Sequence, residues 1–322
     1  MTPGALALAV AAGLLGLALA GPWLLRRSAP ALVRVPRLAI GVISAGVLSW
    51  LGAVLALGPM LAWSRPGPAL LPEGMAEICE QCLAAASPFG GPASASGVPA
   101  VLLLAVPALA GLLLLAGVVA QLRARNRKSR ESALALLRSA RPRLLHGCTA
   151  WVADTDLPIA VAFPARHGGI VVSSGLLERL DEEELIAVLA HEEAHLRQRH
   201  HLIDMMMASI AAHLRWVPFV RAAADALPHY FEIAADDRSR QRVGTPALVS
   251  ALLKIGERSR AEDPSRAAMH AAGPERIRQL VQPSSGRAGI LPTSAVALGG
   301  LSLAIAAVAV HLTYVAVAIN GC

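Results

Sequence analysis

Four long apolar segments without a single Asp, Glu, Lys or Arg constrain this 322-residue chain more than any other feature. They are Leu6–Leu25, Leu38–Trp63, Val98–Ala120 and Leu291–Ile319. A helix needs about 20 apolar residues to cross a hydrocarbon core about 30 Å thick, and each segment reaches that length. Because every backbone polar group must be paired inside a bilayer, we predict four transmembrane helices.

The basic residues predict the orientation, since cytosolic loops are enriched in Lys and Arg. Four arginines lie between Leu25 and Leu38, and five basic residues lie between Gln121 and Arg130, whereas the loop Ser64–Gly97 has one arginine and three glutamates. We therefore expect both termini on the exterior and the segment between the third and fourth helices in the cytosol. A cleavable signal peptide is the alternative for the first segment, but its basic residues follow the apolar run instead of preceding it.

The net charge of +7 is concentrated beside the predicted membrane ends and is not interleaved with aromatic residues. Anionic lipid headgroups are therefore the expected partner, and direct nucleic-acid binding is not expected. The cysteines divide by side of the membrane. Cys79 and Cys82 form a CxxC pair in the exterior loop and predict a disulfide, Cys148 is expected to be a small core residue, and Cys322 lies in the exterior tail.

The chain divides into three parts on this pattern. We expect a membrane region at 1–122, a cytosolic domain at 123–290, and a fourth transmembrane helix with a short tail at 291–322. The cytosolic part begins with short apolar runs separated by turn residues, and helical patterns follow from Gly175 onward, so it is predicted to be α+β. The runs are Ala140–Leu145, Ala150–Val152, Ile159–Phe163 and Ile170–Val172.

The motif His191-Glu192-Glu193-Ala194-His195 carries the chemistry. Histidines four residues apart share one helix face, so both imidazoles can bind one Zn²⁺ ion while Glu192 activates a water molecule. Asp181 as N-cap and Glu184 three residues later predict a capping box for a helix from about Glu182 to His200. The next segment, Leu202–Trp216, is apolar but too short to span, and is predicted to be buried or to lie at the membrane interface.

A catalytic zinc ion keeps three protein ligands and one open position, so a third ligand is needed. Glu232 is the best candidate, and Asp236, one turn later on the same face, is expected to accept a hydrogen bond from a ligand imidazole. The alternative is that both residues are solvated acids beside Arg238 and Arg240. Glu193 is expected to be a solvated neighbour of the motif.

HEEAH followed by Glu-x-x-Ala-Asp resembles the gluzincin peptidases, and its place between a third and a fourth membrane helix resembles the BlaR/MecR-type membrane metallopeptidases. The related HtpX-like and CAAX prenyl endopeptidases share these motifs, but in HtpX-like enzymes the motif follows two membrane helices. The segments 162–177 and Glu275–Leu280 also resemble the surroundings of the zinc site in this group. BlaR/MecR proteins continue into an exterior penicillin-binding sensor, and we expect none here.

The resemblance implies a four-helix membrane protein with a cytosolic gluzincin-like α+β domain. In it, His191, His195 and Glu232 bind one zinc ion, Glu192 is the general base, and Asp236 orients a ligand. His229, Tyr230 and Arg240 are candidate oxyanion donors. The implied activity is a zinc endopeptidase that cuts a cytosolic or membrane-proximal protein, with a BlaI/MecI-like transcriptional repressor as one candidate, and a substrate strand is expected to pair along Ile159–Phe163.

Three alternatives remain from the sequence. One is an HtpX-like protease for membrane-protein quality control, and another is a non-catalytic signalling protein with a structural zinc site. The third, metal transport, is disfavoured because transport sites need ionisable metal ligands within the bilayer, and the four spans contain no Asp, Glu or Cys and only one histidine, His311. The sequence leaves the substrate, the inducing signal and the oligomeric state open.

Overall fold

The computed structural model describes residues 3–63, 99–262 and 290–320, together with a few positions between 74 and 87. Four helices in these ranges are long and apolar enough to cross a membrane: α1 (Pro3–Leu32), α2 (Pro36–Ala62), α4 (Ala100–Leu137) and α12 (Ile290–Asn320). They overlap the four predicted segments, with the ends of the second and third segments displaced by one or two residues. Helices α1 and α4 continue well past the apolar runs, to Leu32 and Leu137, into the basic stretches that follow.

Helix α2 is the centre of this group and contacts α1, α4 and α12. Two hydrogen bonds from side chains to carbonyl oxygens connect α2 to its neighbours α1 and α12. Trp50 Nε1 donates to the carbonyl of Leu14 at 3.0 Å, and Tyr314 Oη donates to the carbonyl of Pro59 at 2.8 Å. Such bonds satisfy polar atoms that would otherwise be costly to place among apolar side chains.

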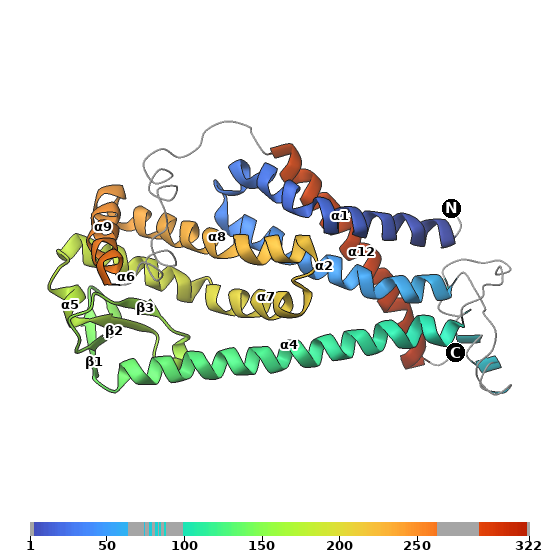
Figure 1. Cartoon of the computed structure of the whole chain (residues 1–322), viewed down its shortest axis with the longest axis horizontal. Coiled ribbons are helices and arrows are strands. Elements are labelled where there is room, and N and C mark those ends of the chain that lie inside the picture. Colours follow the sequence, from blue (N-terminus) through green and yellow to red (C-terminus); the bar gives the residue numbers. More distant parts are fainter. Residues whose placement is uncertain are drawn as a thin grey trace.

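A small mixed sheet lies at the end of the molecule opposite the two termini, and α4 runs the length between them (Figure 1). Its strands have the order β1-β2-β4-β3, with bounds β1 (Ala140–Leu145), β2 (Cys148–Ala153), β3 (Ala160–Ala162) and β4 (Ile170–Ser173). Each overlaps a predicted strand, and β1 has the predicted bounds. The β1–β2 hairpin turns at His146-Gly147, both with positive φ, as the tightest antiparallel turns require.

The chain that follows the sheet, from Ser174 to Glu262, is helical, as predicted from the sequence. Its helices are α5 (Ser174–Leu177), α6 (Glu182–Arg197), α7 (His200–Leu214), α8 (Pro218–Val243) and α9 (Thr245–Glu262), and a short 3₁₀ helix, η1 (Ala165–His167), precedes β4. Helix α6 begins at the predicted capping box, in which Asp181 and Glu184 exchange hydrogen bonds of 2.8 and 2.9 Å. Its apolar face packs on the sheet in a shared hydrophobic cluster.

The predicted extent of the motif helix is wrong at its C-terminal end. The helix stops at Arg197, and Arg199 adopts a left-handed conformation with φ of 53°. A non-glycine residue rarely takes this conformation, and hydrophobic periodicity carries no signal for it. The chain therefore turns, and His200 begins α7 instead of ending α6.

Helix α8 joins the motif region to the apolar helices. Its first half is buried against α1 and α2 in one continuous core that also contains residues of α7. Phe219 is 1% exposed and lies against Gly21 of α1 and near Gly46 of α2. The core therefore extends across the predicted boundary at residue 122, and the three-part division itself stays a prediction.

Gly21→Ala is expected to weaken this packing. A Cβ atom at Gly21 would lie 2.5 Å from Cδ2 of Phe219, so a ring fixed on several sides would have to move. Overpacking of this kind costs about 1 to 3 kcal/mol, and the thermal unfolding midpoint in detergent should fall. Gly16→Ala is the control, since a Cβ atom there meets nothing within 4 Å. Equal midpoints for the two variants would contradict this packing.

Glu184 generates a second prediction, because its buried carboxylate also accepts hydrogen bonds from Ser250 and Lys254 of α9 at 2.5 and 2.6 Å. Burial alone would raise the pKa of Glu184, but the bonds from Lys254, Ser250 and the Asp181 backbone outweigh it and lower the pKa below 4.5. The stabilisation is thus complete above about pH 4.5 and is lost as the pH falls through the lowered pKa.

Glu184→Gln should lower the free energy of unfolding by about 1 to 3 kcal/mol at neutral pH. The difference from wild type should shrink as the pH falls below the pKa of the free carboxyl. Unfolding measured against pH checks this, with the exposed neighbour Glu183→Gln as control. A pH-independent difference would show that the carboxylate charge contributes nothing.

Candidate metal centre

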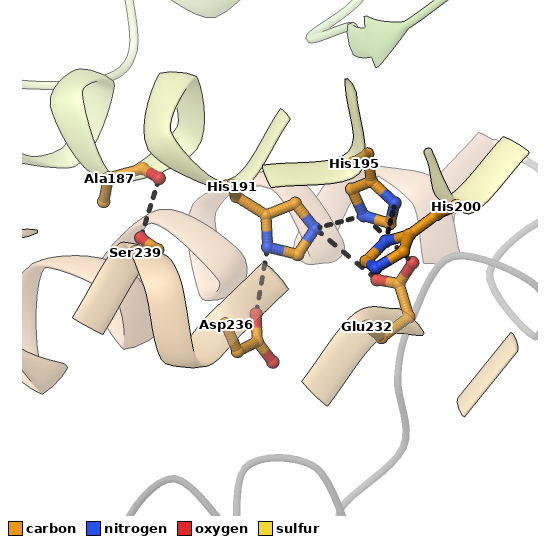
Figure 2. Close-up of polar contacts among 7 residues, drawn as sticks. All are labelled: Ala187, His191, His195, His200, Glu232, Asp236 and Ser239. Atoms are coloured by element: carbon orange, nitrogen blue, oxygen red, sulfur yellow. Dashed lines mark hydrogen bonds and ion pairs between the residues drawn. The ribbon is translucent and has the colours of Figure 1, made fainter. Parts of the chain in front are cut away.

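Helix α6 places the two motif histidines one turn apart with their rings on the same side (Figure 2). Nε2 of His191 lies 3.1 Å from Nε2 of His195. The side chain of His191 is only 12% exposed and that of His195 20%, so both nitrogens are largely shielded from water. Two imidazole nitrogens this close to each other can both bind one metal ion.

Glu232 of α8 completes the group from the opposite side. Its Oε2 atom lies 3.6 Å from Nε2 of His191, and its Oε1 atom lies 3.5 Å from Nε2 of His195. Among the described residues, these three offer ligand atoms that all lie within 4.8 Å of one another. The structure therefore brings together the three residues predicted as ligands, although they come from two helices.

The donor set and its spacing fit zinc. Zn²⁺ binds imidazole nitrogen and carboxylate oxygen at about 2.0 to 2.2 Å in tetrahedral geometry, which separates neighbouring donors by about 3.3 Å. The three separations of 3.1, 3.5 and 3.6 Å lie close to that value. Two histidines and one glutamate also leave a fourth position open, as in catalytic zinc sites.

Asp236 lies behind His191, one turn of α8 beyond Glu232. Its Oδ1 atom is 3.0 Å from Nδ1 of His191, and the residue is 1% exposed. Burial lowers the pKa of His191, but Asp236 and Glu232 outweigh that effect and raise the pKa to about 10. With this raised pKa, His191 carries a proton on both ring nitrogens at neutral pH, and a metal ion that binds Nε2 must displace the proton there. Asp236 can then accept a hydrogen bond from the Nδ1–H group and hold the imidazole in place.

The glutamates that follow His191 differ in their surroundings. Glu193 forms ion pairs with Arg197 at 2.8 Å and with Arg242 of α8 at 3.4 Å, away from the ligand group. Glu192 is half-buried on the same helix as the two histidines. Its role as a general base stays a prediction.

The three candidate oxyanion donors lie in different surroundings. Tyr230 is 4% exposed in the apolar core that α8 shares with α1 and α2, and burial raises its pKa to about 12. Arg240 binds Asp237 at 3.1 Å. His229 is exposed and lies one turn before Glu232 in α8. The donor role of each stays a prediction.

His200 is a member of this site that sequence reasoning missed. Its Nδ1 atom lies 3.0 Å from Nδ1 of His195 (Figure 2). Its ring stacks on Phe231 with a centroid distance of 4.8 Å. Burial, followed by the charge of neighbouring His195, lowers the pKa of His200 to about 3. In a helix that continued to His200, this residue would point about 140° away from His195. Only the turn at Arg199 brings the two rings together.

The predicted cysteine pair is described only in part. Cys82 is disulfide-bonded, whereas Cys79 and Cys322 lie outside the described residues, as does the segment Glu275–Leu280. Cys148 is a free thiol at the start of β2, partly buried against the α6–sheet cluster, and burial raises its pKa. This agrees with the small packing role expected for Cys148.

Asp236→Asn tests how much the buried carboxylate contributes to metal binding. Loss of the charge behind His191 should weaken zinc affinity about 10- to 100-fold, measured by competition with a chromogenic chelator. Asp237→Asn is the control, because this neighbour pairs with Arg240 at the surface instead. If both variants bind zinc as tightly as wild type, Asp236 does not support the metal site.

Residues 121–280, just under half of the chain, match the family model of Peptidase family M48. A protein named Protease HtpX homolog from Acidiphilium cryptum (strain JF-5) is 31% identical over 144 residues, which cover 34% of this chain and 50% of that protein. A Protease HtpX homolog from Aquifex aeolicus (strain VF5) is 50% identical over 46 residues, which cover 14% of each chain. Protease HtpX from Legionella pneumophila (strain Corby) is 49% identical over 45 residues, covering 14% of this chain and 16% of that protein. No solved structure matches.

The similarity thus spans half the length of the first relative and less of the others. It supports the class of membrane zinc metallopeptidases that the motifs implied, but not the specific BlaR/MecR-type assignment. Over the segment that holds His191, His195 and Glu232, the chain is similar to the M48 peptidases, and this similarity supports a zinc metalloendopeptidase.

Proposed function

We propose that this chain is an integral-membrane zinc endopeptidase. The observation that carries the proposal is the convergence of His191, His195 and Glu232 from two helices, with the carboxylate of Asp236 behind His191. A solvated acid, the alternative weighed for Glu232 and Asp236, does not fit Asp236, which is almost fully buried against an imidazole. The M48 match over the same segment supports the same class of reaction.

Bound zinc would supply a Lewis acid that polarises the peptide carbonyl and lowers the pKa of water in the open position. Glu192 would then accept the proton of that water as its oxygen attacks the carbonyl carbon. As the C–N bond breaks, Glu192 would return the proton to the departing amine, so that one water molecule and one peptide bond become a carboxylic acid and an amine.

The sheet offers a place for the substrate chain. In the order β1-β2-β4-β3, strand β3 forms one edge, pairs with β4 on its other side, and contacts α6. A peptide that adds to this edge would pass along the motif helix and present its carbonyl groups near the ligand group. We propose that Ile159–Phe163 guides the substrate in this way.

The substrate class follows from where the centre lies in the fold. Tyr230, Phe231 and Ile233, which flank Glu232, belong to the same core as residues of α1 and α2. If these helices span the bilayer with the orientation predicted from the arginines, the centre is cytosolic and close to the membrane surface. We therefore propose membrane proteins and their cytosolic segments as substrates, in line with the HtpX relatives. Cleavage of a BlaI/MecI-like repressor remains the second candidate, favoured by the three long apolar helices that precede the motif.

Glu192→Gln tests the proposal directly. Removal of a general base is expected to reduce cleavage about 10²- to 10⁴-fold, while zinc content stays at one ion per chain. The purified full-length proteins should be incubated with an unfolded membrane protein and, separately, with a candidate repressor. Glu193→Gln is the matched control and should cleave like wild type, since Glu193 pairs with Arg197 and Arg242.

The outcomes separate the alternatives. Cleavage of the unfolded membrane protein alone favours quality control, and cleavage of the repressor alone favours signalling. Two results together would overturn the peptidase proposal and favour a non-catalytic role. The purified, zinc-loaded wild-type protein would cleave neither substrate, and cells that carry Glu192→Gln would behave like wild-type cells.

A further inference from the structure

His200 is a buried polar residue that the proposed reaction does not use. It is 2% exposed, and it lies at the first position of α7, directly after the left-handed residue Arg199. Its Nδ1 atom is 3.0 Å from Nδ1 of His195. A buried imidazole needs a hydrogen-bond partner, and the one that the structure provides is a ligand of the candidate metal centre.

The direction of this hydrogen bond follows from the other nitrogen of His195. Nε2 of His195 faces the ligand group, 3.1 Å from Nε2 of His191 and 3.5 Å from Oε1 of Glu232. A neutral imidazole that offers its Nε2 lone pair to a metal ion carries its hydrogen on Nδ1. Nδ1–H of His195 therefore donates, and Nδ1 of His200 accepts.

The ring of His200 is fixed from two sides. One face stacks on Phe231, with 25° between the ring planes, and the ring meets His195 edge-on at 86° with centroids 4.9 Å apart. Phe231 is itself buried and directly precedes Glu232 in α8. The acceptor is thus held by the helix that also carries the third ligand, so its position relative to the centre is defined.

We propose that His200 is a positioning residue, which accepts the Nδ1–H hydrogen bond of His195 and holds its Nε2 atom toward the metal. It would do for His195 what Asp236 does for His191, with a neutral acceptor in place of an anionic one. The inference rests on the metal centre of the proposed function. It is tested by metal binding, so it can fail or succeed independently of peptide cleavage.

Two substitutions at this position separate positioning from packing. His200→Phe keeps an aromatic ring to stack on Phe231 but has no acceptor, whereas His200→Asn places an amide oxygen near the position of Nδ1. His201→Phe is the control at the next residue, which is partly exposed. The readouts are zinc affinity by chelator competition and the visible absorption spectrum of the Co²⁺-loaded full-length protein.

His200→Phe should weaken zinc affinity about 10- to 100-fold and change the Co²⁺ spectrum. His200→Asn should restore most of both, and His201→Phe should match wild type. Wild-type affinity in His200→Phe, or an equal loss in His200→Phe and His200→Asn, would overturn the proposal.

A measurement on the wild-type protein tests the hydrogen bond between His195 and His200 even if a variant does not fold. The ¹⁵N chemical shifts of His195 in the zinc-loaded protein should show a protonated Nδ1 and a metal-bound Nε2. The Nδ1 proton should couple through the hydrogen bond to Nδ1 of His200. A His195 ring that binds metal through Nδ1, or an Nδ1–H group that exchanges freely with water, would exclude the proposed hydrogen bond.

Discussion

The rest of the structure depends on how α8 packs, because this helix contacts both the apolar helices α1 and α2 and the motif helix α6. The first half of this helix is buried between α1 and α2, where Phe219 occupies the space left by Gly21, and its second half carries Glu232 and Asp236 to the motif histidines. Near its end, Ser239 Oγ donates to the carbonyl of Ala187 in α6 at 2.7 Å, a contact that requires close approach of the two helices. Phe219 and Glu232 are 13 residues apart, or about 20 Å along the same helix. The apolar helices and the metal centre are therefore parts of one framework, and the position of the third ligand depends on how α8 sits between α1 and α2.

The centre concentrates polar groups in a region with little access to water, where each of these side chains faces another through at least one of its polar atoms. Asp236 would be costly to bury alone, but it faces His191, and His200 would be an unpaired imidazole without His195. The two ligand histidines are thus held from behind by acceptors of different charge. A carboxylate behind His191 makes that ligand more basic than one that faces a neutral ring, so the two Nε2 atoms would not bind a metal ion equally. The larger share of the charge that balances a cation comes from α8, through Glu232 and Asp236.

Local patterns in the sequence predicted the elements of this fold well. Uncharged apolar runs indicated the four long helices, and short apolar runs separated by turn residues indicated the four strands. Asp181 and Glu184 indicated where α6 begins. The candidate ligands were also accessible from sequence, because His191 and His195 are four residues apart, as are Glu232 and Asp236, and this spacing places each pair on one helix face. Two features were not accessible. The insertion of Phe219 beside Gly21 joins residues almost 200 positions apart, and no local pattern records such a contact. The end of α6 was placed about three residues too late, because residues 197–201 are all polar and no apolar pattern marks where the chain turns.

The break itself shows why an unfavourable local conformation can persist at a functional site. A left-handed arginine costs about 1 to 2 kcal/mol, and nothing in the residue type of Arg199 favours it. A continuous helix would avoid this cost but would carry His200 away from His195 and the start of α7 away from α4. The turned chain buries His200 against Phe231 and lets α7 pack along α4, where His213 lies against Gly117. Burial of these aromatic and apolar surfaces is large enough to offset one strained residue. The same turn brings His200 within hydrogen-bond distance of His195. The strained residue therefore lies at the point where a change of chain direction places His200 behind a candidate metal ligand.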